Sequence, residues 1–207
     1  MRQEIDRPHC LDEVSYEYFY QNQAKESRHS RLRKGSRMKP LNWAIKEILN
    51  NKPAPCKVLD VGCQHGSIGL ILAPLWYDIW AIDVSGRYVG EASRNTDMLN
   101  DWIQYRVLPV EKAWKLYQMF DVILCLSVLE HVRDFDIAWN SMLDNAYDEA
   151  LILSIVPIGE SWMSEEHTRI FTDDNIYEYF PKSAKVSEIK FSDELGWYAI
   201  KYIKEAT

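Results

Sequence analysis

Three features are absent from this 207-residue chain: paired cysteines, a long apolar run and a surplus of basic residues. The four cysteines show no Cys-x-x-Cys pair and no metal-ligand spacing, which favours free thiols in a reducing compartment (Cys10, Cys56, Cys63 and Cys125). No run approaches the length that crosses a bilayer, and the first residues, MRQEIDRPHC, contain no apolar core of a secretory signal. We therefore expect a cytoplasmic protein without a membrane span.

The charge balance argues against a general nucleic-acid binder. The formal net charge is -7, whereas proteins that bind nucleic acids or acidic membranes usually carry a basic surplus. One stretch departs from this balance, because seven basic residues stand between Lys25 and Lys39 against the single acid Glu26. A solvated helix face, or a segment that recognises phosphate, accounts for this stretch without nucleic acid.

The length and the 47% hydrophobic content fit one packed domain with a modest helical extension. Residues Leu11–Asn51 have a helical pattern of mixed charge, and Ala44, Ile45 and Ile48 fall on one face of a helix expected at Leu41–Leu49. The segment Asn51–Pro55 then breaks the pattern. We predict an N-terminal helical extension over 1–51 and the main domain over 52–207.

Short apolar runs alternate with helical patterns along the main domain. The expected strands are Lys57–Val61, Ile79–Ile82, Ile103–Val107, Asp121–Leu126, Leu151–Val156, Lys185–Phe191 and Trp197–Ile203. The expected helices are Ser67–Ala73, Gly86–Asn100, Phe135–Asn145 and Asp173–Phe180, with Ser85 and Thr172 as N-caps of two of them. This alternation predicts an α/β fold with a mostly parallel seven-stranded sheet, covered by helices on both faces. The last two strands are joined by a turn too short for a crossover and should form an antiparallel hairpin at the C-terminal edge.

The loop after the first strand carries the most information. The run Val58–Ala73 leads from an apolar strand through Asp60, turns at Gly62 and Gly66, and enters a helix near Ser67. Ligands of open α/β sheets bind beyond the carboxyl ends of the strands, near such a turn. A glycine there lets the backbone approach a ligand closely.

Asp83 falls at the tip of the second strand, about 20 residues after these glycines. An acidic side chain at that point can accept hydrogen bonds from both hydroxyls of a ribose; the alternative is a capping or solvated residue. The glycines at 62, 66 and 69 do not have the G-x-G-x-x-G spacing of a nicotinamide site. We therefore expect a nucleoside cofactor other than NAD.

The loop resembles the first motif of class I S-adenosylmethionine-dependent methyltransferases, a strand followed by acidic-x-G-x-G-x-G. Asp60, Gly62 and Gly66 match this motif, and Gln64 replaces its middle glycine. The resemblance implies a Rossmann-like methyltransferase fold that binds S-adenosylmethionine. The cofactor-binding residues that it implies in this half of the site are Asp60, Gly62, Cys63, Gln64, Gly66, Asp83 and Val84.

The segment Pro109–Val132, which would form the second half of the cofactor site, is similar to the ubiquinone-biosynthesis O-methyltransferases and related small-molecule enzymes. In that branch, the pair that corresponds to Val110 and Glu111 lies beside the adenine; a solvated loop carboxylate is the alternative for Glu111. Leu126 and Ser127, at the end of the fourth strand, would place backbone groups near the ammonium of the methionine moiety.

His131, in the family sequence LEHV, lies over the same edge of the sheet. With an unperturbed pKa near 6.5, it can act as a general base toward a hydroxyl or amine; the alternative is a histidine that braces its loop. A His-x-Arg-x-Phe-Thr segment of the family follows the fifth strand, and there His167 and the nearby Trp162 are candidates for substrate contact.

No metal is expected. Some relatives bind magnesium through a Glu-x-x-Glu-His pattern at the position of LEHV. Ser127 stands where the first of these glutamates would be, and a hard octahedral ion needs more oxygen ligands than Glu130 and His131 provide.

The sequence thus predicts methyl transfer from S-adenosylmethionine to an oxygen or nitrogen of a small polar metabolite, a sugar or a lipid precursor. In this family the N-terminal segment often forms a lid, a role that the aromatic residues from Tyr16 to Tyr20 suit. One alternative is a nucleic-acid methyltransferase, favoured only by the basic stretch, since the Asn/Asp-Pro-Pro-aromatic motif is absent after the fourth strand. Another is a non-catalytic binding module, which the replacement at Gln64 makes conceivable.

Overall fold

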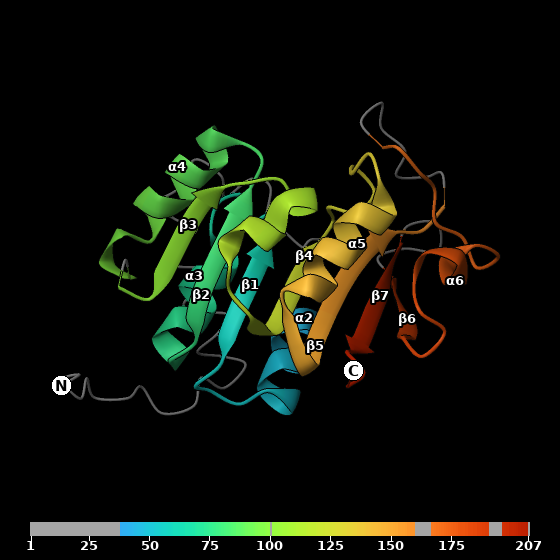
Figure 1. Ribbon diagram of the computed structural model, residues 1–207, viewed down its shortest axis with the longest axis horizontal. Coiled ribbons are helices and arrows are strands. Elements are labelled where there is room, and N and C mark those ends of the chain that lie inside the picture. Colours follow the sequence, from blue (N-terminus) through green and yellow to red (C-terminus); the bar gives the residue numbers. More distant parts are fainter. Residues whose placement is uncertain (1–37, 100, 160–166, 191–195, 207) are drawn as a thin grey trace. The chain divides into compact units, whose positions relative to one another are not determined.

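The computed structural model describes residues 38–99, 101–159, 167–190 and 196–206 (Figure 1). Lys39–Thr207 form one compact unit. The expectations for the aromatic residues at 16–20, for most of the basic stretch and for Trp162 fall outside the described residues. The division of the chain at residue 51 stays a prediction.

The predicted seven-stranded sheet is confirmed. Its strands are β1 (Lys57–Val61), β2 (Asp78–Asp83), β3 (Ile103–Val107), β4 (Phe120–Leu126), β5 (Ala146–Pro157), β6 (Lys185–Lys190) and β7 (Gly196–Ile203). They lie in the order β3-β2-β1-β4-β5-β7-β6, from left to right in Figure 1. The first five strands are parallel, and β7 runs antiparallel to both β5 and β6. The C-terminal hairpin is therefore the antiparallel edge of the sheet, as expected.

The central strands are buried because they consist almost entirely of apolar residues. Val58 and Leu59 of β1 pair with Val122 and Ile123 of β4, and all four side chains have no exposed surface. Parallel strands covered on both faces read as continuous apolar runs of this kind. Because these strands are parallel, their carboxyl ends meet at one edge of the sheet.

The helices are α2 (Met38–Asn51), α3 (Ser67–Leu72), α4 (Gly86–Asn95), α5 (Phe135–Asp144) and α6 (Ile176–Tyr179). Among the described residues, three 3₁₀ segments accompany them: η2 (Ala73–Leu75), η3 (Asp97–Leu99) and η4 (Val110–Leu116), the last of which the sequence did not predict. The side chain of Ser85 accepts a hydrogen bond from the Tyr88 amide, which confirms this N-cap. The interpretation of Thr172 as an N-cap is wrong, because a turn intervenes and α6 begins only after Asn175.

The helix from Gly86 is shorter than expected. It ends at Asn95, and the next residue, Thr96, is buried. The hydroxyl of Thr96 donates to the carbonyl of Ala92 (3.0 Å) and forms a second hydrogen bond with the hydroxyl of Tyr105 (3.1 Å). This side-chain bond to the backbone offers the chain an alternative to further helix.

Two apolar layers cover the sheet. On one face, η4, α5 and α6 pack in a single core cluster that includes Phe135, Trp139 and Phe180. On the other face, Trp43 of α2 packs against Trp197 in a smaller cluster, and the predicted apolar face of α2 is confirmed by the burial of Ala44, Ile45 and Ile48. Lys201 of β7 and Glu47 of α2 form an ion pair of 2.7 Å. Within the described ranges, the structure contains no helix with the length and apolarity of a membrane span.

Candidate active site

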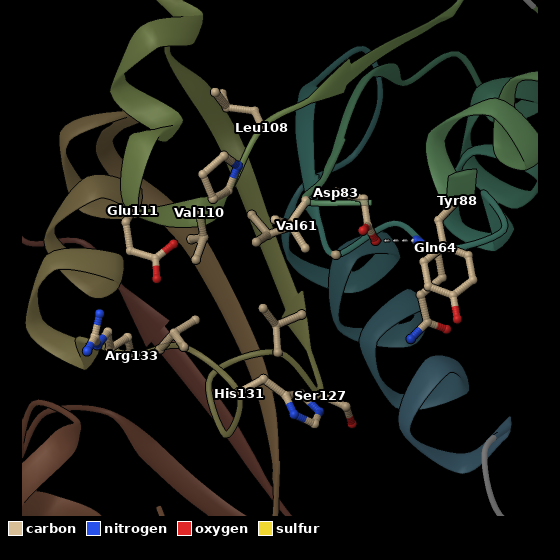
Figure 2. Close-up of a pocket in the computed structure, with 15 residues that line it drawn as sticks. Val61, Gln64, Asp83, Tyr88, Leu108, Val110, Glu111, Ser127, His131 and Arg133 are labelled. Atoms are coloured by element: carbon tan, nitrogen blue, oxygen red, sulfur yellow. Dashed lines mark hydrogen bonds between the residues drawn. The ribbon is translucent and has the colours of Figure 1, made fainter. Parts of the chain in front are cut away.

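A pocket of about 580 Å³ opens at the edge of the sheet where β1, β2 and β4 end (Figure 2). Eight of the residues selected from the sequence line it: Gly62, Gln64, Asp83, Val84, Val110, Glu111, Ser127 and His131. Sequence reasoning missed Val61, Tyr88, Leu108, Pro109, Val128, Val132 and Arg133. Asp60, Cys63, Gly66 and Leu126 are not part of the lining. The volume is in the range of small-molecule and cofactor sites.

Gly62 lets the loops after β1 and β4 come together. Its φ is +74°, a left-handed conformation that glycine adopts without strain. A Cβ added to it would lie 2.3 Å from Cγ2 of Val128. The floor of the pocket therefore depends on the missing side chain at this position.

Gly66 has a different structural reason to be a glycine. It also has a positive φ, +79°, but an added Cβ would meet the hydroxyl of Tyr105 at 2.6 Å, behind the pocket. This glycine seats the start of α3 against β3. Cys63, which is buried, fixes the same loop from behind by donating its backbone N–H to the carbonyl of Ile82 at 3.0 Å.

The carboxylate of Asp83 stands at the tip of β2, as the sequence predicted. It is buried, with 7% of its surface exposed. Its Oδ2 accepts a hydrogen bond from the backbone N–H of Gln64 (3.1 Å), and its Oδ1 accepts one from that of Ser85 (2.8 Å). Because each carboxylate oxygen can accept more than one hydrogen bond, both remain able to receive ribose hydroxyls in the pocket.

Asp60 lies beneath the pocket, and its side chain is almost fully buried. Burial, with a further contribution from the charge of Asp83, raises the pKa of Asp60 to about 7. This carboxyl does not line the cavity.

The wall on the side of β3 comes from four consecutive residues, Leu108 to Glu111. The backbone N–H of Leu108 donates to the carbonyl of Asp83 at 2.9 Å, which ties this wall to the tip of β2. Val110 is buried at the start of η4, and Glu111 points its carboxylate toward the cavity (Figure 2). The adjacency of Leu108 and Pro109 to Val110 was the one sequence signal that they belong to the site.

A sharp turn at Ser127 sends the chain from β4 across the pocket. Ser127 has a φ of +55° and donates its backbone N–H to the carbonyl of Ile155 (2.9 Å). Leu126, just before the turn, packs with Trp197 on the α2 face of the sheet, which explains why it does not reach the cavity. The turn instead directs Val128 and His131 into the lining.

His131 borders the pocket with 40% of its side chain exposed. Its Nε2 lies 4.0 Å from Oε1 of Glu130, and its ring centroid lies 4.7 Å from that of His167 in an edge-to-face arrangement. Glu130 is buried, and this burial raises its pKa to about 7, an effect that the charge of Arg169 opposes. The structure thus joins two histidines, from segments far apart in the chain, beside one buried carboxyl.

The segment that carries His167 holds the His131 loop in place. Thr168 donates its backbone N–H to the carbonyl of Glu130 (2.8 Å) and its hydroxyl to that of Val132 (2.8 Å). The guanidinium of Arg169 donates to the carbonyl of Leu129 and packs over the ring of Phe135. The segment with the His-x-Arg-x-Phe-Thr pattern therefore stabilises the loop that carries His131.

Glu130, His131 and His167 place one ligand atom each within 4.8 Å of one another. This set contains two imidazole nitrogens and one carboxylate oxygen. Magnesium prefers an octahedron of oxygen ligands, so the set does not fit the ion that the sequence argument considered. The absence of a required metal stays a prediction.

The comparison with protein families now adds to this geometry. Residues 32–182 match the model of a methyltransferase domain family, and the chain belongs to that family. The resemblance to class I S-adenosylmethionine-dependent methyltransferases, drawn from the Asp60 loop and LEHV, is confirmed.

Several curated relatives are named ubiquinone biosynthesis O-methyltransferase. The protein from Rhizobium etli is 25% identical over 126 residues, which cover 61% of this chain and 50% of the relative. The protein from Acinetobacter baylyi is 35% identical over 115 residues, with coverages of 51% and 45%. That from Psychrobacter arcticus is 36% identical over 81 residues, with coverages of 38% and 32%. The matched regions thus span from about a third to a half of the length of these relatives.

Solved structures share the fold at low identity. The N-methyltransferase NodS from Bradyrhizobium japonicum has a TM-score of 0.67 at 15% identity, and the match covers 82% of this chain and 96% of that one. A Burkholderia thailandensis 1,6-didemethyltoxoflavin-N1-methyltransferase, solved with S-adenosylhomocysteine, has a TM-score of 0.67 at 14% identity, with coverages of 98% and 94%. The [4+2]-cyclase SpnF also scores 0.67, at 13% identity, with coverages of 80% and 81%. These likenesses establish the fold and do not identify the methyl acceptor.

Proposed function

We propose that this chain transfers a methyl group from S-adenosylmethionine to an oxygen or nitrogen of a small polar metabolite, a sugar or a lipid precursor. The observation that carries the proposal is the convergence of Gly62, Asp83 and Glu111, from three separate loops, on one pocket at the carboxyl edge of the sheet. The O-methyltransferase names of the curated relatives support an acceptor of this size.

Different residues of the pocket would bind the ribose, the adenine and the methionine moiety of this cofactor. Asp83, with both oxygens held in place by backbone amides, accepts the two ribose hydroxyls. Val110 packs against the adenine, with Glu111 at its polar edge. Ser127 would present a backbone group toward the ammonium, with Leu126 supporting its turn from outside the lining, and Cys63, Val84 and Gly66 would complete the loops around these contacts. Asp60, which does not line the cavity, would support the loop that carries Gly62.

When bound, the sulfonium supplies an electrophilic methyl group. The chain's own task is to hold the acceptor in line with that group and to keep water away, which accounts for most of the rate in displacements of this kind. His131 accepts the proton of a hydroxyl acceptor, and His167, whose ring lies edge-to-face against that of His131, contacts the acceptor beside it. Trp162 is a further candidate for contact with the acceptor. Arg169 and Thr168 fix the loop that carries His131.

The acceptor is a small molecule rather than a nucleic acid, because the net charge is negative and the motif of base-amine methylation is absent. The enzyme requires no magnesium. The thiols of Cys56, Cys63 and Cys125 are free, which is consistent with a reducing, cytoplasmic environment.

Calorimetry combined with a transfer assay tests the proposal. S-adenosylhomocysteine should bind and NAD should not. Incubation with labelled S-adenosylmethionine and a small-molecule extract should label a fraction that survives nuclease treatment. Labelling confined to nucleic acid would replace the proposed acceptor class, and binding without transfer to any fraction would indicate a non-catalytic module.

A further inference from the structure

Gln64 stands where the family motif has a glycine, and its backbone keeps a glycine-like conformation. Its φ is +44°, in the left-handed region that side chains other than glycine rarely adopt. Its N–H is fixed on Asp83 (3.1 Å), so the loop cannot relax without losing that bond. A glycine would adopt this conformation at lower conformational cost. The presence of a larger side chain at a strained position of a pocket suggests that the side chain has a function.

The side chain of Gln64 is exposed and lines the pocket. Its amide has no hydrogen-bond partner among the residues that the structure describes. In Figure 2 it lies across the cavity from Glu111, beside Tyr88, with Asp83 between the two sides. The amide therefore occupies the end of the pocket opposite the proposed adenine wall.

We propose that the Gln64 amide binds the amino acid end of the cofactor, a contact that the glycine of the family motif cannot make. The inference rests on the proposed cofactor. If Val110 and Glu111 face the adenine and Asp83 the ribose, the remaining end of the pocket receives the methionine moiety. That moiety carries a carboxylate and an ammonium, and a primary amide offers both a donor for the first and an acceptor for the second.

The test compares two ligands that differ in this end. S-adenosylhomocysteine carries the amino and carboxylate groups, whereas 5′-methylthioadenosine keeps the adenine, ribose and sulfur without them. Gln64→Gly should weaken the binding of S-adenosylhomocysteine about 10- to 100-fold, the effect of losing a hydrogen bond to a charged group. The affinity for 5′-methylthioadenosine should stay the same. Gln64→Ala should give the same two results.

Thermal stability supplies a second readout. Gln64→Gly relieves the strained backbone and should raise the melting temperature of the ligand-free protein by about 1–4 °C. Glu149→Gly is a matched control, since Glu149 also has a positive φ (+63°) but lies outside the pocket. It should raise the melting temperature similarly and leave both affinities unchanged.

The outcomes separate this inference from the proposed function. An unchanged affinity of Gln64→Gly for S-adenosylhomocysteine overturns the inference. An equal loss for both ligands overturns it too, because Gln64 would then act by shaping the Asp83 loop. Failure of the unaltered protein to bind S-adenosylhomocysteine at all would instead remove the proposed cofactor.

Discussion

The Oδ2 atom of Asp83 accepts a hydrogen bond from the backbone N–H of Gln64 at 3.1 Å. This bond joins the loop after β1 to the tip of β2, and the Leu108 amide, bonded to the carbonyl of Asp83, joins the wall after β3 to the same residue. One aspartate therefore holds three loops at the edge of the sheet. The arrangement makes the pocket before any ligand arrives, and so reduces the ordering cost of binding.

Asp83→Ala should weaken the binding of S-adenosylhomocysteine by about 1.5–3 kcal/mol, since it removes a charged acceptor from paired hydroxyls. Isothermal calorimetry gives the affinity directly. Asp78→Ala is the matched control, because Asp78 lies at the opposite end of the same strand and outside the pocket. Equal affinities of the two variants would remove Asp83 from the ribose site.

Most of the central sheet could be predicted from sequence, but β5 begins at Ala146, five residues before the predicted start at Leu151, because the exposed residues Tyr147, Asp148 and Glu149 interrupt the apolar run. β1 and β3 have the predicted bounds, because short apolar runs between turn residues leave few other ways to bury them. Asp83 was found for a similar reason, since its distance from the glycines reflects one crossover of the chain. The 3₁₀ segment η4 was missed, although its buried residues Val110, Ala113 and Leu116 recur at every third position, which is the repeat of a 3₁₀ helix.

The second half of the site shows where sequence reasoning ends. Val128 and Val132 look like ordinary core residues, and only the left-handed turn at Ser127 directs Val128 into the pocket. The proximity of His131 and His167 depends on the hydrogen bonds of Thr168 to a loop 36 residues earlier. Contacts between such distant segments leave no local pattern from which they can be predicted.

The stability of the ligand-free protein should fall as the pH rises from about 4 to 7. The pKa of Asp60 is raised from 3.8 to about 7 in the folded state, so the folded protein retains a proton that the unfolded chain loses. The stabilising effect is complete below the unfolded value and is lost as the pH rises through the folded one. The titration of this one carboxyl lowers the free energy of unfolding by at most about 1.4 kcal/mol per pH unit between about pH 4 and 7.

Asp60→Asn tests this cause, because the amide keeps the shape and cannot ionise. The difference between the melting temperatures at pH 5 and pH 8 should be smaller in this variant than in the unaltered protein. Asp148→Asn, at an exposed position, should leave the difference as it was. A pH profile of Asp60→Asn that coincides with the original would show that this carboxyl does not titrate in the window.

Methyl transfer should not depend on magnesium. Ser127 stands where the expected Glu-x-x-Glu-His pattern would have its first glutamate, and the ligand set Glu130, His131 and His167 in the described part of the chain holds only one carboxylate. Transfer of label from S-adenosylmethionine should therefore proceed equally with and without EDTA. Loss of transfer in EDTA, with recovery on addition of magnesium, would show that the reaction depends on the ion. If magnesium then failed to restore transfer in His167→Ala, the ion would be placed at Glu130, His131 and His167.

The exchange His131→Asn tests the general base. It should leave the affinity for S-adenosylhomocysteine unchanged, since no contact with the cofactor is assigned to the imidazole. It should lower the rate of transfer to a hydroxyl acceptor about 10²- to 10⁴-fold, the usual contribution of a positioned acid or base.

A bracing role for His131 predicts a different pattern. The ring packs on His167, so its removal would then lower the melting temperature while each folded molecule retained its rate. Thr168→Val serves as the comparison, because it removes the hydrogen bond from the Thr168 hydroxyl to the carbonyl of Val132, and so loosens the same loop without removing the proposed base. If both variants lose stability equally and both keep nearly full turnover on a hydroxyl acceptor, His131 is a structural residue; if only His131→Asn loses turnover, the proton is transferred to His131.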